Sequence, residues 1–342
     1  MSMQHRETSW SRREFVSGVV AGTAGLLGLS PDRVSAEPPP ETKSLRLIQR
    51  TGVDCISPQH IAQELLSAEG FTDVSYLRTS GRETEVERAL ATGEAHITMH
   101  YVPALIAQID RGDEVVILAG GHVGCYELFT TKRIRSIRDL KGKPVGVPGF
   151  GTVPWQLLGI MMAHVGLDPR KDMKFVPVSP PEQAALLVEG KIDAFFGFPP
   201  ASHEFREKGI GHVIFNSAVD RPWSQYFCCV VAGNREFVSK HPVATKRAVR
   251  AILKAADLCA LEPTRIARAL VDKGFTKRYD YALQTLQGLP YGRWREYDAE
   301  DSVRFYALRL FEAGMIKSSP HRIIAQGTEW RFLNELKKEL KA

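Results

Sequence analysis

From residue 45 onward, short apolar runs alternate with longer amphipathic segments, and this alternation constrains the fold more than any other feature of the chain. The run 45–50 predicts a strand, and 57–70 predicts a helix that begins at Ser57 and stops at Gly70. The same pattern predicts strands at 73–78, 95–100 and 115–121, and helices at 82–93 and 102–112. Strands that alternate with helices of about 10–15 residues are typical of β-α-β units. We therefore expect an α/β fold with a mostly parallel sheet covered by helices.

A second run of the same kind follows residues 126–131. It predicts strands and helices in the order 144–149, 152–166, 174–179, 180–190 and 193–198, then a helix and the strands 212–218 and 225–232. Beyond Gly233 the apolar residues recur at helical spacing to the end of the chain. The expected architecture is two α/β units followed by a helical tail.

The composition is that of an ordinary globular protein. The chain has 342 residues, of which 44% are hydrophobic and 25% charged, with a formal net charge of +6. This length is enough for two structural units and a buried core without a disulfide framework. The basic cluster 132–135 has no interleaved aromatic residues, so we expect a solvated loop there and no nucleic-acid partner.

The first 36 residues have the pattern of an export signal. Arg12 and Arg13 precede an apolar, glycine-rich run at 15–29, and Val34-Ser35-Ala36 offers a small-residue cleavage site. We expect a twin-arginine signal peptide at 1–36, a linker at 37–44 and a periplasmic location for the mature chain. The alternative is a disordered basic tail with a chance arginine pair. The apolar run is too short to span a bilayer.

The five cysteines show no metal-ligand spacing. They are Cys55, Cys125, Cys228, Cys229 and Cys259. No C-x-x-C occurs, so no metal site is expected. Because neighbouring strand residues face opposite ways, Cys228 and Cys229 are expected to serve core packing.

The stretch 146–162 has three glycines at its start, Gly146, Gly149 and Gly151, just before an apolar helix. The spacing is not that of a dinucleotide loop, and no acidic residue ends the next strand, so no nucleotide cofactor is expected. Thr152 suits the N-cap, and the first amides of the helix can hold an anionic oxygen. The alternative is a tight strand-to-helix turn without a ligand.

Three long segments, 86–121, 136–178 and 182–205, resemble the periplasmic substrate-binding proteins of ABC importers. The similarity is to the nitrate/sulfonate/taurine family, which includes a branch that binds thiamine precursors, and it covers essentially the whole mature chain. One departure is His96, which stands where the family usually has an Asp.

This resemblance implies a two-lobed type II periplasmic-binding-protein fold with a ligand cleft between the lobes. Lobe 1 would comprise 45–125 and 228–342, and lobe 2 would comprise 126–227. Such proteins close on a small ligand like a hinge and deliver it to a membrane permease and its ATPase. We expect a monomer that binds a small anionic or polar organic ligand.

The carboxyl ends of the strands should line the cleft, since open α/β sheets bind ligands there. The loops at these ends, with the first turn of the helix near 152, supply amides, hydroxyls, imidazoles and aromatic rings, and no obvious Arg or Lys. The candidate ligand-binding residues are Ser57, Gln59, His60, His100, Tyr101, His122, Gly151, Thr152, Val153, Trp155 and Phe198.

Two other functions stay open. The segment 54–58 resembles the region around the nucleophilic cysteine of a desulfinase that has the same fold, and Cys55 close to His60 could form a thiolate–imidazole pair. A periplasmic sensor domain is the second alternative.

Overall fold

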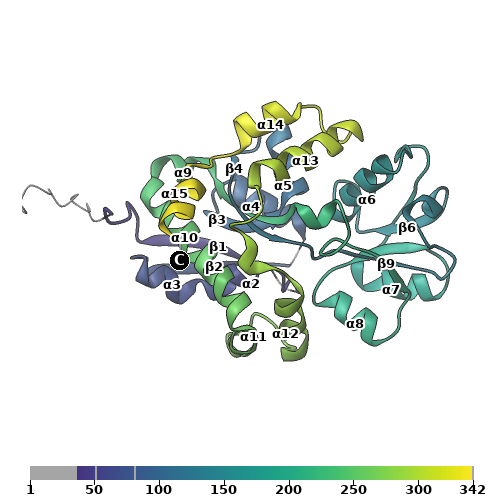
Figure 1. Cartoon of the computed structure of the whole chain (residues 1–342), viewed down its shortest axis with the longest axis horizontal. Helices are drawn as coiled ribbons and strands as arrows, with labels where there is room; N and C mark the ends of the chain where they lie inside the picture. Colours follow the sequence, from purple (N-terminus) through teal and green to yellow (C-terminus); the bar gives the residue numbers. More distant parts are fainter. Residues whose placement is uncertain (1–36, 51, 81, 341–342) are drawn as a thin grey trace, which may run out of the picture. The chain divides into compact units, whose positions relative to one another are not determined.

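The computed structural model describes residues 37–50, 52–80 and 82–340. The expected signal peptide at 1–36 lies outside the described residues. The chain from Pro39 onward forms one compact unit, whose fold is given below (Figure 1). None of the helices in the described residues is both long and apolar enough to cross a lipid bilayer.

Two small sheets form around the N-terminal strands. Strand β1 (Ser44–Arg50) pairs in parallel with β2 (Asp73–Thr79) over its full length. Strand β10 (Phe227–Asn234) lies between β3 (Ile97–Tyr101) and β4 (Val115–Val123) and is antiparallel to both. All residues of β3, β4 and β10 are buried, which explains their nearly continuous apolar sequences.

The third sheet has five strands in the order β7-β6-β8-β5-β9. Their bounds are β5 Glu127–Thr130, β6 Pro144–Val147, β7 Lys174–Pro177, β8 Ala194–Gly197 and β9 His212–Asn216. Strand β6 is parallel to β7 and β8, whereas β5 is antiparallel to β8 and β9. The expectation of a mostly parallel sheet is wrong, because β5 and β10 are antiparallel to all their neighbours. These are the two strands at which the chain passes from one sheet to the other.

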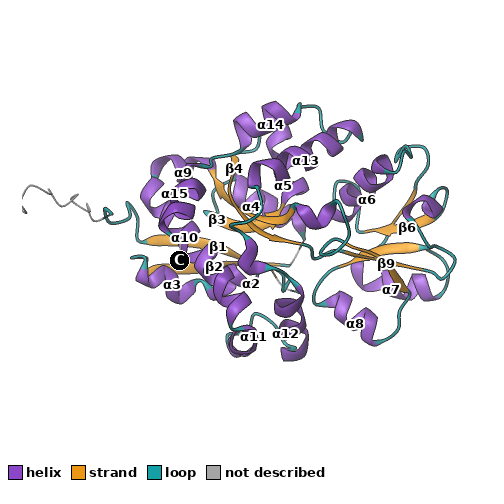
Figure 2. Ribbon diagram, viewed as in Figure 1, coloured by secondary structure: helices purple, strands orange, loops and turns teal. Residues whose placement is uncertain are grey.

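Helices cover these sheets, as Figure 2 shows. The helices between strands are α2 (Ser57–Ile61), α3 (Gln63–Ala68), α4 (Glu83–Ala91), α5 (Val102–Arg111), α6 (Val153–His164), α7 (Pro180–Val188) and α8 (Ala201–Glu207). The C-terminal helices are α9 (Arg235–Lys240), α10 (Pro242–Leu261), α11 (Pro263–Asp272), α12 (Tyr279–Gly288), α13 (Ala299–Glu312), α14 (Pro320–Gly327) and α15 (Arg331–Glu339). Short 3-10 turns lie at Ile137–Leu140, Trp223–Gln225 and Tyr291–Arg293. The helix expected at 57–70 is split at Ala62 into α2 and α3.

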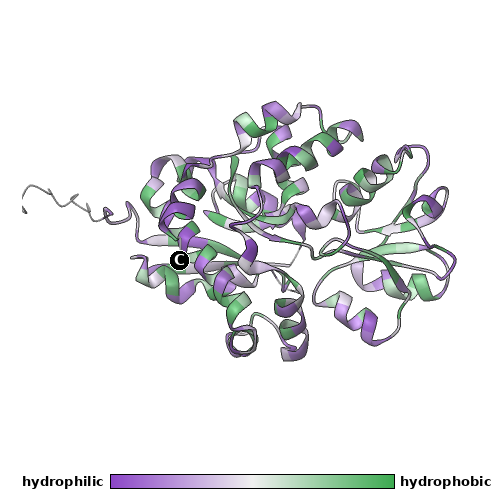
Figure 3. Cartoon of the chain, in the orientation of Figure 1, coloured by the Kyte–Doolittle hydropathy of each residue, from purple (hydrophilic) through white to green (hydrophobic). Residues whose placement is uncertain are grey.

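The amphipathic pattern of the sequence is visible along the helices, where hydrophobic and hydrophilic residues alternate (Figure 3). The largest fully buried side chains include Trp294, Tyr291 and Tyr306 from the C-terminal part of the chain. The Tyr291 hydroxyl donates to the carbonyl of Cys55, at 2.9 Å. The C-terminal segment therefore packs against the loop that follows β1.

His96 makes two contacts in the core of the fold. Its Nδ1 accepts a hydrogen bond from the Arg46 amide at 3.2 Å, and its ring stacks on Phe237 with centroids 4.2 Å apart. The imidazole thereby joins the first half of β1 to the region around β3 and α9.

Candidate functional site

The loop after β1 is held by the very side chains that were expected to bind a ligand. Gln59 donates to the carbonyl of Ile48 and accepts from the amide of Met99, both at 2.5 Å, so it joins β1 to β3. Ser57 donates to the carbonyl of Asp54 at 2.6 Å. Both side chains are buried and bonded to the backbone. In this structure they shape the loop.

Three of the candidate residues are buried histidines. The His60 ring stacks on Phe275 at 4.4 Å, and His122 lies edge-on to Tyr291 at 5.1 Å. Burial lowers the pKa of His60 and of His100 to about 3, with the nearby charge of Arg50 adding to the effect. Both rings are therefore neutral at pH 7.

Arg50, which the sequence analysis did not single out, is buried at the end of β1. One of its Nη atoms lies 3.4 Å from Nδ1 of His100. The structure thus places a basic side chain, which was not expected from the sequence, among the candidate histidines, because β1 ends beside β3. A buried guanidinium can hold an anionic group.

An aromatic chain connects residues of the small sheets to residues of the five-stranded sheet. Tyr101 at the end of β3 lies 5.1 Å from Tyr126, measured between ring centroids, and Tyr126 lies 5.4 Å from Phe198. The amide of Asp54 donates to the carbonyl of Pro199 at 3.3 Å in the same region. The structure therefore brings together the candidates Tyr101 and Phe198 through Tyr126, a residue that sequence reasoning missed.

The start of α6 is in contact with an acidic side chain from α4. The Val153 amide donates to Oε2 of Glu83 at 2.7 Å. Thr152 occupies the N-cap position, as expected, but its hydroxyl donates to the carbonyl of Gly149 at 2.7 Å and accepts no bond from the helix. Gly151 is exposed, and its φ of +82° lies in the left-handed region, which glycine adopts without steric cost. The helix amide expected to receive an anionic ligand thus receives a carboxylate of this chain.

Trp155 lies apart from the aromatic chain of Tyr101, Tyr126 and Phe198. It packs against Phe150 and Phe175, with ring centroids 6.2 and 6.3 Å away. Phe150 is 67% exposed, so this second aromatic cluster is at the surface.

Two acids accompany these groups, the buried Asp54 and the half-buried Glu83. Burial raises the pKa of Glu83 from its usual 4.5 to about 7, against the lowering effects of Arg50 and the Val153 amide. Burial also raises the pKa of Asp54 to about 6, opposed by a hydrogen bond from Thr276. No specific sequence pattern indicated that Glu83 belongs to this region. It lies in the first turn of α4, where acidic residues are common because they interact favourably with the helix dipole.

A cavity of about 360 Å³ lies between the five-stranded sheet with α8 and the region of α12. Its lining residues are Cys125, Glu127, Pro199, Ser202, His203, Arg206, Asn216, Ala218, Gln284, Thr285, Gln287, Gly288 and Leu289. Arg206 forms an ion pair with Glu127, and Nε2 of His203 lies 2.9 Å from the Thr285 hydroxyl. None of the eleven candidate residues, all of which the structure describes, lines this cavity.

A larger cavity, of about 590 Å³, lies between the segment 218–226 and residues 293–301. It is lined by Tyr226, Arg293, Asp298 and neighbouring residues. Its wall also contains Ser224, Gln225, Glu296, Tyr297 and Asp301, which makes it strongly polar. Neither cavity by itself singles out a ligand.

Comparison with protein families and curated sequences gives consistent relatives. A family model described as NMT1/THI5 like matches residues 69–266. The taurine-binding periplasmic protein of Escherichia coli (strain K12) is 27% identical over 172 residues, which cover 50% of this chain and 52% of that protein. The nitrate import ATP-binding protein NrtC of Synechocystis is 25% identical over 232 residues, which cover 63% of this chain and 34% of that protein. The chain thus spans about half and about a third of the length of these two curated relatives.

Among solved structures, the periplasmic nitrate-binding protein NrtA from Synechocystis PCC 6803 superposes with a TM-score of 0.72 at 15% identity. The match covers 89% of this chain and 90% of that one. The two proteins therefore share the periplasmic-binding-protein fold.

Proposed function

Because the chain belongs to the NMT1/THI5-like family and has the fold of a periplasmic nitrate-binding protein, we propose that it is the solute-binding component of an ABC importer. It binds a small anionic or polar organic solute of the sulfonate, carboxylate or nitrate class. It then delivers that solute to a membrane permease, whose ATPase drives uptake.

The main support for the proposal is that the chain connects the three-stranded and five-stranded sheets twice. The chain leaves the three-stranded sheet after β4, builds the five-stranded sheet, and returns through β10 to lie beside β4. Two crossing segments, near 124–126 and 217–226, support a hinge between a lobe of 45–125 with 228–342 and a lobe of 126–227. Ligand-dependent closure of such lobes is the motion that a binding protein needs.

The ligand class follows from the groups at the carboxyl ends of the strands. Arg50 supplies a positive charge, while neutral His100 and the hydroxyl of Tyr101 supply polar contacts. Tyr126 and Phe198 add aromatic walls. In an open form of the protein, the Val153 amide and Thr152 join this set from the α6 side. An anion with a small organic body suits these groups.

Export by the twin-arginine route and a periplasmic location complete the proposal. The arginine pair, the apolar run and the small-residue cleavage site stand in the order that this route requires. Mass spectrometry of protein recovered from the periplasm, in cells with and without a functional twin-arginine translocase, tests this part.

Ligand binding is tested by thermal unfolding in the presence of taurine, longer alkanesulfonates, nitrate, bicarbonate, carboxylates and pyrimidines. A solute that binds only the folded state raises the Tm with its concentration. Thr152→Val and Tyr101→Phe should weaken binding of the stabilising solute, and Thr72→Val at an exposed loop position is the matched control. If both site variants keep the wild-type affinity, the site is elsewhere, and the cavity beside His203 becomes the next place to test.

The desulfinase alternative has little support from the environment of Cys55. The Cys125 thiol favours its thiolate, but the interaction with Cys229 and burial prevail and raise the pKa of Cys55 well above its usual range. A nucleophilic cysteine needs the opposite shift. Unchanged solute binding and the absence of sulfinate turnover in both the wild type and Cys55→Ser would exclude this activity. A two-component gene pair beside the gene, in place of permease and ATPase genes, would favour the sensor alternative.

A further inference from the structure

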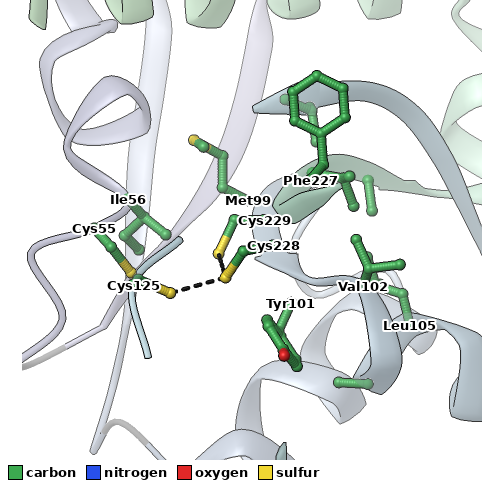
Figure 4. Packing of buried hydrophobic residues seen from close by; sticks show 14 of the residues in the cluster. Cys55, Ile56, Met99, Tyr101, Val102, Leu105, Cys125, Phe227, Cys228 and Cys229 are labelled. Carbon is green, nitrogen blue, oxygen red and sulfur yellow. Dashed lines mark hydrogen bonds between the residues drawn. The ribbon is translucent and has the colours of Figure 1, made fainter. Parts of the chain in front are cut away.

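Four of the five cysteines meet at one place in the fold, as Figure 4 shows. Cys55 comes from the loop after β1, Cys125 from the segment after β4, and Cys228 and Cys229 from the start of β10. The Sγ atoms of Cys55, Cys125 and Cys229 all lie within 4.8 Å of one another. Cys228 Sγ lies 2.8 Å from that of Cys125 and 3.8 Å from that of Cys229. All four are buried free thiols.

The vicinal pair corrects an expectation of the sequence analysis. Cys228 and Cys229 were expected to face opposite sides of their strand, yet their sulfur atoms are in contact. The cause is a β-bulge: the pairing of β10 with β4 shifts at Phe227, Cys229 and Val230, which breaks the alternation. The bulge turns both sulfurs toward the cluster.

The sulfur separations suit a single thiophilic ion. A tetrahedral zinc site with Zn–S bonds of about 2.3 Å has sulfur atoms about 3.8 Å apart. The trio of Cys55, Cys125 and Cys229 needs only a small contraction from its separations of up to 4.8 Å. A contraction of about 1 Å lies within the reach of rotation about the Cα–Cβ bonds of the three cysteines.

An imidazole stands beside the thiols with one nitrogen available. His122 is the cross-strand partner of Cys229 in the β4–β10 ladder. Its Nδ1 lies 3.0 Å from the Val123 carbonyl, while its fully buried Nε2 finds no hydrogen-bond partner among the described residues. A carbonyl that holds Nδ1–H leaves the Nε2 lone pair free, which is the arrangement found behind metal-binding histidines.

The cluster also has a strained backbone and borders a cavity. Cys125 has φ +103°, the only positive φ among the described residues other than glycine. Strain of this kind persists where the surrounding structure holds a side chain in place. Cys125 also lines the 360 Å³ cavity, so one member of the cluster lies at a cavity wall.

We propose that Cys55, Cys125 and Cys229, with His122 or Cys228 as the fourth ligand, bind one thiophilic d¹⁰ cation, zinc(II) or copper(I). The site goes beyond solute transport and does not depend on it. Each thiol that binds the ion releases its proton to solvent. Because its ligands come from the crossing segment at Cys125, from the start of β10 and from the β1 loop, the bound ion joins parts of the chain that are far apart in the sequence.

The test uses the purified chain, reduced and stripped of metal, under anaerobic conditions. Cobalt(II), the spectroscopic stand-in for zinc, should give intense sulfur-to-metal charge-transfer bands that saturate at one equivalent per chain. Zinc should then displace cobalt. A separate titration with copper(I) against a chromophoric chelator shows which of the two cations binds more tightly.

Variants locate the ligands. Cys229→Ala and Cys125→Ala should each lower the affinity at least 100-fold, and His122→Gln should lower it less. Cys259→Ala is the matched control, because Cys259 is an equally buried thiol on α10 outside the cluster, and it should bind like the wild type. Circular dichroism confirms that each variant is folded.

Three results would overturn the proposal. One is the absence of charge-transfer bands in the folded, reduced wild type. Another is a metal affinity that the cluster variants leave unchanged. The third is a Cys125–Cys228 disulfide in the protein as isolated, found by alkylation and mass spectrometry, together with no metal bound after its reduction. None of these results affects the solute-binding test, so the two proposals fail independently.

Discussion

The carboxylate of Glu83, at the start of α4, accepts a hydrogen bond of 2.7 Å from the amide of Val153, at the start of α6. The two residues are 70 positions apart in the sequence. The bond joins a helix that follows β2 to a helix of the five-stranded sheet, so the acid holds the amide that a bound anion could otherwise take.

The burial of Glu83 makes stability depend on pH, because it raises the pKa of this acid more than the hydrogen bond from Val153 lowers it. Its pKa of about 7 in the fold exceeds the usual 4.5, so the folded state holds a proton that the unfolded chain has lost between these values. The free energy of unfolding therefore falls as pH rises from about 4.5 through 7. Glu83→Gln should be more stable than the wild type at pH 8 by about 1–2 kcal/mol, an advantage that shrinks toward pH 5.

Urea unfolding of both proteins at pH 5, 6, 7 and 8 measures this difference. Glu85→Gln is the control with the opposite sign, because hydrogen bonds from Ser80 lower the pKa of Glu85. A difference between Glu83→Gln and the wild type that stays constant over this range would mean that Glu83 is ionised throughout.

The ion pair between Glu69 and Arg250 is predicted to matter for stability. The two side chains are only 10% and 13% exposed, and Arg250 Nε lies 2.9 Å from the carboxylate. Glu69→Ala removes the closest carboxylate of Arg250, which keeps a 3.2 Å contact with the more exposed Glu339, so the free energy of unfolding should fall by about 3 kcal/mol, the lower end of the range for a buried pair.

The matched control is Glu204→Ala, which removes an exposed partner of Lys208 and should cost less than about 1 kcal/mol. Chemical denaturation of both variants compares the two pairs. Equal losses would mean that burial does not strengthen the role of Glu69.

Gly120 in β4 is predicted to tolerate no larger side chain. A Cβ at this position would lie 2.1 Å from the ring of Phe227, which is itself fully buried on the neighbouring strand. Gly120→Ala should therefore destabilise the fold by about 1–3 kcal/mol through overpacking.

Gly288, the last residue of α12, offers the contrast. A Cβ there meets nothing within 4 Å, and its backbone has no positive φ. Gly288→Ala should be neutral or stabilise by up to about 1 kcal/mol. Thermal unfolding of the two variants side by side checks the pair; a stable Gly120→Ala protein would mean that Phe227 can move aside.

Arg50 is predicted to select anionic solutes. Because its charge lies beside His100 at the end of β1, Arg50→Gln should weaken binding of an anionic solute about tenfold or more and leave neutral solutes unaffected. Calorimetric titration gives both affinities. Arg46→Gln, on the same strand but bonded to the carbonyls of Gly93 and Glu94, is the control for nonspecific loss of charge.

Local patterns in the sequence were enough to place most elements. Pro154 in the first turn and Thr152 before it predicted the start of α6, and the structure begins this helix at Val153. The apolar run 115–121 predicted β4, which extends to Val123. Such signals are local because helix caps and apolar runs involve residues a few positions apart.

The direction of β5 and β10 and the bulge in β10 could not be predicted from local sequence patterns. The alternation of elements predicted parallel pairing, yet β5 and β10 pair antiparallel with neighbours that are distant in the sequence. Likewise, the alternation rule placed Cys228 and Cys229 on opposite faces, whereas the bulge brings their sulfurs within 3.8 Å. The pairing partner decides both features.

The order and type of the elements, and the resemblance to periplasmic binding proteins, could thus be read from the chain, since periodicity and motifs are properties of neighbouring residues. Which groups meet depends on how the elements pack. Glu83 bonds to Val153, Arg50 lies beside His100, and Cys125 contacts Cys228, which is 103 positions away in the sequence. Such contacts arise from the packing of whole elements, in which buried polar and thiol groups must find partners that no local spacing reveals.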